Sequence, residues 1–194
     1  MALTTVNKIK TQWINDQSTV NDTRYKLLIG QAEAVINSIC KQPVNGTAVA
    51  HDFIPERGNR VHLLHYTVPV QLVSLQYRDL PTDAWTTASG AVVFTSGGVT
   101  SIYYDEGFNA AMWRANLTVG YDGTVNAVPA DLEEICCEMV VDLFKFSDFG
   151  GRENRFGIQQ IATNEGGMTQ TTIFRDMTAR FRQRLAPYVL RAWL

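Results

Sequence analysis

Residues 114–144 contain the change from strand to helix that decides the fold, and they open with RANLTVGY (114–121). This run is rich in residues that favour strands, and turn residues follow it, so it predicts a β-strand. After a short loop comes VPADLEEICCEMVVDLF (128–144), where apolar residues recur at the three-and-four spacing of a helix. Pro129 stands where the first helical turn tolerates proline, and nearby acids complement the positive end of the helix dipole. A β region therefore leads directly into a helix.

An earlier helix is predicted before the β region, over residues 22–41. Tyr25, Leu28, Ala32 and Ile36 lie on one face of it at helical spacing. Residues 5–15 favour a shorter helix, which at that length would depend on docking to another element.

The segment between these helices has the pattern of a β insertion. Short runs rich in branched and aromatic residues alternate with turn signals, at residues 61–66, 70–77, 91–94, 100–104 and 114–121. Five or six such strands can form a small sandwich or a barrel-like sheet. The predicted fold class is α+β: a small helical bundle (residues 1–43 and 124–194) with an antiparallel β subdomain (44–123) inserted between the first and second main helices.

The C-terminal part of the chain combines an apolar stripe with arginines. After a polar stretch with one short strand predicted at residues 158–162, a last helix should start near Ile173 and be kinked or ended by Pro187. Arginines flank the apolar stripe of this helix on both sides, and residues 188–194 form an apolar arm. An apolar terminus predicts docking, either onto a neighbouring protein or back onto the chain's own helices.

Charge is distributed unevenly along the 194 residues, whose total is only −2. Residues 1–149 carry 10 Lys and Arg against 16 Asp and Glu, whereas residues 150–194 carry seven Arg, no Lys and three acids. Guanidinium groups pair with carboxylates or phosphates, so this arginine segment suits an interface with a partner of either kind. The sequence pI near 5.9 argues against a dedicated nucleic-acid binder, although the last helix could still bind nucleic acid alone.

Two further classes are not expected. No run approaches the roughly 20 apolar residues of a membrane-spanning helix, and the N-terminus lacks the apolar core of a secretory signal, so we expect folding in a cytoplasm. The odd set of Cys40, Cys136 and Cys137 offers no disulfide framework and no zinc spacing. We interpret these cysteines as small buried residues.

Motifs for catalysis are absent from the sequence: it has no P-loop, GxSxG, HExxH or GxGxxG. His62 and His65 would point to opposite faces of a strand, so they should not share a metal, and His51 lacks further ligands at a fixed spacing. Asp105-Glu106 before Gly107 is typical of a solvated hairpin turn. No catalytic residue, cofactor or metal site is predicted.

Two alternatives remain open at this point. The β region could be a carbohydrate- or protein-binding module that uses aromatic residues, chiefly Trp85, Tyr103, Tyr104 and Trp113, although most of these should be core or interface residues. An enzyme would need an unrecognised site around His51, His62, His65, Asp105 and Glu106.

Several segments, in their order, resemble the head–tail connector (adaptor, or head-completion) proteins of tailed bacteriophages. AEAVINSIC (32–40) is similar to the end of that family's first helix, and PVQLVSL (69–75) to one of its strands. LTVGY (117–121) followed by VPADL (128–132) resembles its most recognisable signature, and LAPY (185–188) the close of its last helix. The long segment between the first two helices resembles the β insertion of longer members.

The resemblance implies a structural virion protein and not an enzyme. Such proteins form a ring, expected to be twelve-fold, between the portal and the tail at the particle neck. They extend the channel through which DNA passes without sequence-specific binding, and they present a surface to the next neck or tail-completion protein. The expected partners are copies of itself, the portal and that neck protein, with assembly in the host cytoplasm and no membrane.

The candidate portal-docking residues lie on the last helix and the arm. They are Arg175, Arg180, Arg182, Arg184, Tyr188, Leu190, Arg191, Trp193 and Leu194.

Overall fold

The computed structural model describes residues 2–96, 99–148, 160–165, 168–173 and 177–190. The fold is α+β, with helices and antiparallel sheets, as the sequence predicts. The chain divides into two compact units. The first, which we call the β unit, comprises Met1–Leu3, Cys40–Val128 and Pro187–Leu194; the second, the helical unit, comprises Thr4–Ile39 and Pro129–Ala186.

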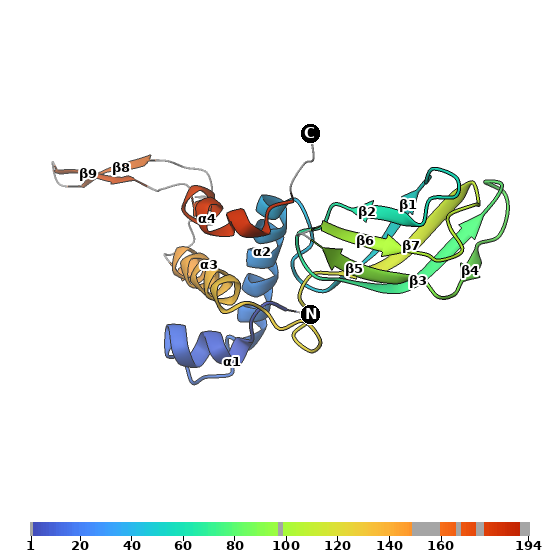
Figure 1. Ribbon diagram of the computed structural model, residues 1–194. Helices are drawn as coiled ribbons and strands as arrows, with labels where there is room; N and C mark the ends of the chain where they lie inside the picture. The colour runs from blue at the N-terminus through green and yellow to red at the C-terminus, as the bar shows by residue number, and fades with distance from the viewer. Residues whose placement is uncertain (1, 97–98, 149–159, 166–167, 174–176, 191–194) are drawn as a thin grey trace. The chain divides into compact units, whose positions relative to one another are not determined.

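The β unit contains two antiparallel sheets (Figure 1). One has the strand order β1-β7-β3-β4 and the other the order β2-β6-β5. The strands are β1 (Thr47–Phe53), β2 (Val61–Leu64), β3 (Val70–Arg78), β4 (Thr86–Ala88), β5 (Val92–Ser96), β6 (Val99–Tyr103) and β7 (Met112–Val119).

Alternation of side chains along the strands builds a core between the two sheets. In β7, Trp113, Ala115, Leu117 and Val119 are buried, whereas the residues between them are partly exposed. Aromatic rings from both sheets meet there: the ring of Phe53 stacks on the His62 ring at 3.7 Å between centroids. The β unit is therefore a small sandwich, one of the two forms that the sequence allowed.

In the described part of the chain, the helical unit consists of four α-helices, a π-helical turn and a hairpin. Its core comes from apolar stripes, such as Tyr25, Leu28 and Ile36 in one helix, and the Tyr25 ring lies 5.2 Å from that of Phe144. Figure 1 shows α3 and α4 side by side. The elements are α1 (Val6–Lys8) with the π-helical turn Ile9–Ile14, α2 (Asp22–Cys40), α3 (Ala130–Asp148), β8 (Gln160–Glu165), β9 (Met168–Ile173) and α4 (Met177–Leu185). The 3₁₀ turn Ala186–Tyr188 follows α4, and its last two residues belong to the β unit.

The short N-terminal helix is held by contacts on both sides, as its length requires. Ile9 is fully buried, and Lys8 Nζ lies 2.7 Å from Glu133 Oε2 of α3. Lys10 Nζ lies 2.7 Å from Asp22 Oδ1 at the start of α2. These contacts explain how a segment too short to be stable alone remains helical.

Three strands that the sequence did not predict, and one helix start, differ between prediction and structure. β1 and β4 were not predicted, because β1 contains two alanines and β4 is only three residues long, so neither has a dense run of branched and aromatic residues. β9 was not predicted either, because it lies in the polar stretch where only one strand, at residues 158–162, is expected. The last helix begins at Met177 and not near Ile173, which ends β9. The threonines of MTQTTI (168–173) favour a strand, and this local preference outweighs the helical spacing.

Candidate functional site

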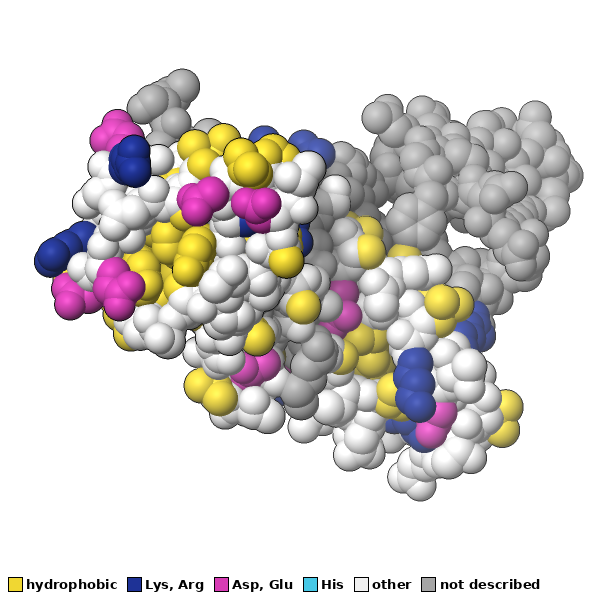
Figure 2. Space-filling view, turned by 90° about the vertical axis from the view of Figure 1, so that its right-hand side faces the viewer, with side chains coloured by type: hydrophobic (Ala, Val, Ile, Leu, Met, Phe, Trp, Pro, Cys, Tyr) yellow, Lys and Arg dark blue, Asp and Glu magenta, His cyan; other side chains and the backbone are white. Residues whose placement is uncertain are grey.

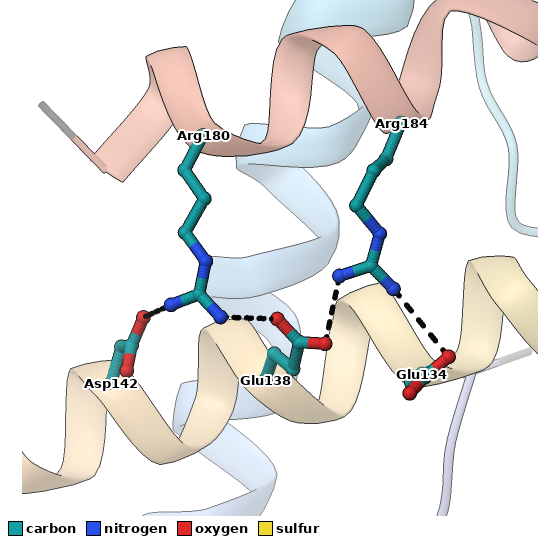
Figure 3. Close-up of polar contacts among 5 residues, drawn as sticks. All are labelled: Glu134, Glu138, Asp142, Arg180 and Arg184. Carbon is teal, nitrogen blue, oxygen red and sulfur yellow. Dashed lines mark hydrogen bonds and ion pairs between the residues drawn. The ribbon is translucent and has the colours of Figure 1, made fainter.

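Two arginines of α4 form a ladder of ion pairs with three acids of α3 (Figure 3). Arg180 donates from Nη2 to Glu138 Oε2 at 2.8 Å and reaches Asp142 Oδ2 at 3.5 Å from Nη1. Arg184 donates from Nη1 to Glu138 Oε1 at 2.7 Å and from Nη2 to Glu134 Oε2 at 3.4 Å. Acids and arginines both repeat every four residues, so one face of each helix meets the other.

Glu138 is the centre of the ladder because it accepts from both arginines. Its side chain is only 15% exposed, whereas that of Glu134 is 54% exposed. The hydrogen bond from Arg184 to Glu138 raises the pKa of that guanidinium. Burial raises the pKa of Asp142, and the positive charge of Arg180 opposes that rise. The ladder therefore fastens α4 to α3 within the chain, and the carboxylate of Glu138 is better shielded from water than that of a typical surface pair.

The segment after α4 is anchored in the β unit. Tyr188 is 8% exposed, and its ring lies 6.3 Å from the Tyr121 ring at an interplanar angle of 81°. The buried Gln42 donates from Nε2 to the Tyr188 carbonyl oxygen at 2.6 Å, and Leu190 N–H donates to the Cys40 carbonyl oxygen at 2.8 Å. The described start of the apolar arm therefore lies on its own chain.

The candidate docking residues fall into three groups. Arg180, Arg184, Tyr188 and Leu190 make the intramolecular contacts above, and Arg182 lies exposed on α4. The remaining candidates lie outside the described residues: Arg175, Arg191, Trp193 and Leu194.

A glycine directly follows β7, the strand that precedes α3 in the chain. Gly120 has φ +101°, and a Cβ there would lie 2.6 Å from the carbonyl carbon of Val44. Gly120 N–H donates to the Pro69 carbonyl oxygen at 2.8 Å, and Tyr121 N–H donates to that of Val44 at 2.9 Å. Only glycine fits such a position without strain, which gives a physical reason for the Gly-Tyr pair at the end of β7.

Beyond Gly120, a carboxylate organises the loop to α3. Asp122 Oδ1 accepts backbone N–H groups of Thr124, Val125 and Asn126 at 2.8–3.0 Å. These bonds lower the pKa of Asp122 to about 2.

The structure brings His51 and His62 together across the two sheets, a contact that the sequence does not predict. Their Nε2 atoms lie 3.1 Å apart. Burial, followed by the repulsion of His51 and His65, lowers the pKa of His62 to about 4, and burial lowers that of His51 as well. The pair is thus held neutral inside the sandwich, while His65 is exposed. The two-residue spacing of His51 from the buried Phe53 was the one available signal that His51 faces the core.

Most of the aromatic residues considered for a binding platform are not free to form one. Trp113 and Tyr104 are buried. Trp85 lies against two arginines: the guanidinium carbons of Arg78 and Arg114 are each 4.4 Å from its ring centre. Arg114 in turn makes two hydrogen bonds to Asp52, at 2.6 and 2.8 Å.

The described residues contain no group of three or more His, Cys, Asp or Glu that could hold a metal ion. The three cysteines are free and buried, and burial raises the pKa of each thiol. The pKa of Cys40 rises to about 11, so its thiol is unreactive at neutral pH. Asp105 is exposed and pairs loosely with Arg60 at 3.4 Å, in a turn closed by Gly107 N–H donating to the Tyr104 carbonyl oxygen. Glu106 is exposed as well, and it accepts a hydrogen bond from the Tyr104 hydroxyl at 2.8 Å.

Charges of both signs are mixed on the face drawn in Figure 2. There, Lys and Arg side chains lie beside Asp and Glu side chains, and the described residues of this face show no continuous basic surface. In the described part of the chain, no helix combines the length and the hydropathy that a membrane crossing requires.

No protein-family model matches the sequence, and neither does any curated protein. Among solved structures, the chain is similar to one described as the neck of an empty GTA particle, computed with C6 symmetry. The TM-score is 0.60 at 12% sequence identity, and the match covers 97% of this chain and 90% of that chain. Because the identity is so low, the likeness establishes a shared fold over nearly the whole length.

Proposed function

We propose that the chain is a structural protein of the neck of a tailed phage or phage-like particle, where it forms a ring between the portal and the tail. One observation carries this proposal: the fold of nearly the whole chain, helical unit and β unit together, is that of a chain in a particle neck. The order of segments that resembles head–tail connectors supports the same role independently, since it was found in the sequence alone. The protein acts by assembly and not by catalysis.

The proposed ring has twelve copies. The neck that this chain resembles was computed with C6 symmetry. A ring of twelve identical subunits also contains a six-fold axis, so that symmetry is compatible with six copies or with twelve. In either case each subunit meets the next through two different surfaces, as closed rings require.

The channel of such a ring must let DNA move. The net charge of −2 and the mixed charges of Figure 2 support a lining that does not retain phosphates. A basic lining would release counterions and hold the DNA, which would oppose passage. We therefore propose passage without sequence-specific binding.

Docking to the portal is assigned to the outer side of α4 and to the residues after Leu190. Arg182 is exposed there, whereas Arg180 and Arg184 contact α3 and so position the helix. Arg191, Trp193 and Leu194 are the proposed apolar and basic contacts with the portal, and the next neck protein binds elsewhere on the ring.

Removal of the gene from the producing host tests the neck role. We expect heads that carry portal but no tails, with the chain found in normal particles by mass spectrometry. Tailed, infectious particles formed without the chain would refute the proposal.

A charge reversal separates portal docking from folding. Arg182→Glu should prevent head–tail joining, because it places a carboxylate where a guanidinium should meet the portal. Lys26→Glu makes the same change of charge at an exposed position of α2 and should leave joining intact. A truncation after Leu190 gives a second test that keeps the buried Tyr188 in place. Normal joining by both the Arg182 variant and the truncation would remove the docking assignment.

A further inference from the structure

The hairpin of β8 and β9 lies between α3 and α4 in the chain and forms a sheet of its own. Its two strands have six residues each and pair over their whole length. In the described part of the chain, neither strand pairs with a third one. Both outer edges of the hairpin therefore carry backbone N–H and C=O groups that no strand satisfies. An isolated pair of strands is only marginally stable in water.

The register gives this hairpin no apolar face that it could bury. Directly paired residues share a face, and successive pairs alternate between the two faces. On each face, residues of polar type outnumber those of apolar type, whereas a strand pair that packs on helices or on another sheet needs an apolar face. The hairpin must therefore be stabilised through its edges. One face has Gln160, Ala162, Asn164, Thr169, Thr171 and Ile173, and the other has Ile161, Thr163, Glu165, Met168, Gln170 and Thr172.

The two open edges belong to different strands, as a closed ring requires. Copies related by rotation about a ring axis meet through two different surfaces, so β9 of one copy can meet β8 of the next but not another β9. When the hairpins run along the axis, all β8 strands point one way and all β9 strands point the other way. The contact between copies is then antiparallel, which is the same kind of pairing that the hairpin has internally.

We propose that the hairpins of neighbouring copies pair edge to edge, β9 of one with β8 of the next, and form a closed sheet that lines the DNA channel. This inference rests on the proposed function, in which the chain forms a ring around DNA. A closed sheet has no edge strand, so closure satisfies the unpaired backbone groups of every hairpin at once. The occupant of each edge is therefore a second copy of this chain.

The width of the hairpin determines where such a sheet can close. With strands about 4.8 Å apart, two strands from each of twelve copies give a circle roughly 37 Å across between backbones. Side chains occupy about 5 Å on each side, half the spacing of packed sheets, and the tilt of the strands widens the circle. The remaining opening is wider than duplex DNA, whereas six copies would leave only about 8 Å before any tilt. Farther from the axis the hairpins would be too far apart to pair.

The charge of the hairpin suits a channel lining. Residues 150–194 carry seven arginines, but residues 160–173 contain no arginine and no lysine, and their one charged residue is Glu165. Lysine and arginine bind phosphates and displace the counterions of DNA, so a lining without them lets the DNA move. Positive charge is thus missing from the segment that we place nearest to the DNA.

Photo-crosslinking in assembled particles tests this pairing. A benzoylphenylalanine replaces Thr171 of β9 in one variant and Thr87 of β4, which is exposed, in a matched control. Trypsin cleaves after Arg155 and Arg175, so the whole hairpin lies in the single peptide 156–175. After irradiation we expect two copies of this peptide joined to each other, which requires two subunits, and a ladder of products larger than dimers. Position 87 should give at least about tenfold less of these products.

Each outcome of the crosslinking decides the proposal. A ladder that contains joined hairpin peptides supports the closed sheet. Dimers without larger products indicate a two-fold contact and overturn it. Crosslinks to another protein or to another part of the chain, or no crosslinks although the chain is in the particle, also overturn it and leave the neck role intact. Absence of the chain from normal particles refutes both proposals.

A proline variant gives a second measurement. Thr171→Pro removes a backbone N–H and interrupts the strand, so incorporation of the chain into particles should fall at least about tenfold. Thr171→Val keeps a residue that favours strands and should be incorporated normally. Both purified variants should keep the thermal midpoint of the original protein, because the hairpin adds no apolar core. Equal incorporation of the two variants, or a lower midpoint for the proline variant alone, would contradict the proposal.

Discussion

Acidification should destabilise the β unit through His62. The unfolded chain titrates this imidazole near its ordinary pKa of 6.5, whereas the folded protein holds its pKa at about 4. As the pH falls through that interval, His62 binds a proton in the unfolded state but not in the folded state. The free energy of unfolding therefore has its highest value above about pH 6.5 and decreases as the pH falls from about 6.5 to about 4.

The size of this effect follows from the two pKa values. One pKa unit corresponds to about 1.4 kcal/mol, so the full loss is about 3 kcal/mol and the loss between pH 8 and pH 5 is about 2 kcal/mol. His51 adds to it in the same direction because burial lowers its pKa too. Urea unfolding at both pH values measures the difference, followed by tryptophan fluorescence, to which Trp85 and Trp113 of the β unit contribute.

Two variants identify the group responsible. His62→Phe preserves the stacking on Phe53 and removes the titration, so the difference between pH 8 and pH 5 should fall below about 1 kcal/mol. His65→Gln changes an exposed histidine and should retain most of the difference. A His62→Phe protein with the full pH dependence, or a wild type with none, would refute the reasoning.

Three further predictions follow from named contacts. Gly120→Ala should destabilise the β unit by about 3 kcal/mol or more in the same urea assay. Gly58 also has a positive φ, but no atom lies within 4 Å of an added Cβ, so Gly58→Ala should lower stability by only about 1 kcal/mol. Glu138→Gln should lower the stability of the helical unit by roughly 1–2 kcal/mol in thermal unfolding, and the more exposed Glu134→Gln by less than about 0.5 kcal/mol; equal effects would contradict the central role of the first carboxylate. Gln42→Ala should lower stability by about 1–3 kcal/mol and increase hydrogen exchange in residues 188–190, and unchanged exchange there would show that the buried amide does not anchor the segment.

The sequence predicted that arginines flank the apolar stripe of the last helix, but it did not predict which groups these arginines contact. The guanidinium groups allowed carboxylates or phosphates, on this chain or another. The structure shows that Arg180 and Arg184 contact acids of α3, about 40 positions away in the chain. The residue pattern within α3 or within α4 does not indicate that these two helices pack against each other.

The apolar arm shows the same division. Its composition predicted docking, and both a neighbour and the chain itself were open. Tyr188 is buried against its own chain through Gln42, a residue 146 positions away. A contact at that separation depends on how the chain closes, so no periodicity within the arm could have indicated it.

The sequence by itself determined the α+β class, the main helices, most strands of the insertion and the lack of a recognisable catalytic motif, because these depend on residue types at short spacing. Tertiary structure alone decided that His51 meets His62 and that Glu138 is shared by two arginines. Those features arise where separate elements pack together. Their geometry is fixed by the register of whole sheets and the faces of whole helices, which local preferences leave undetermined.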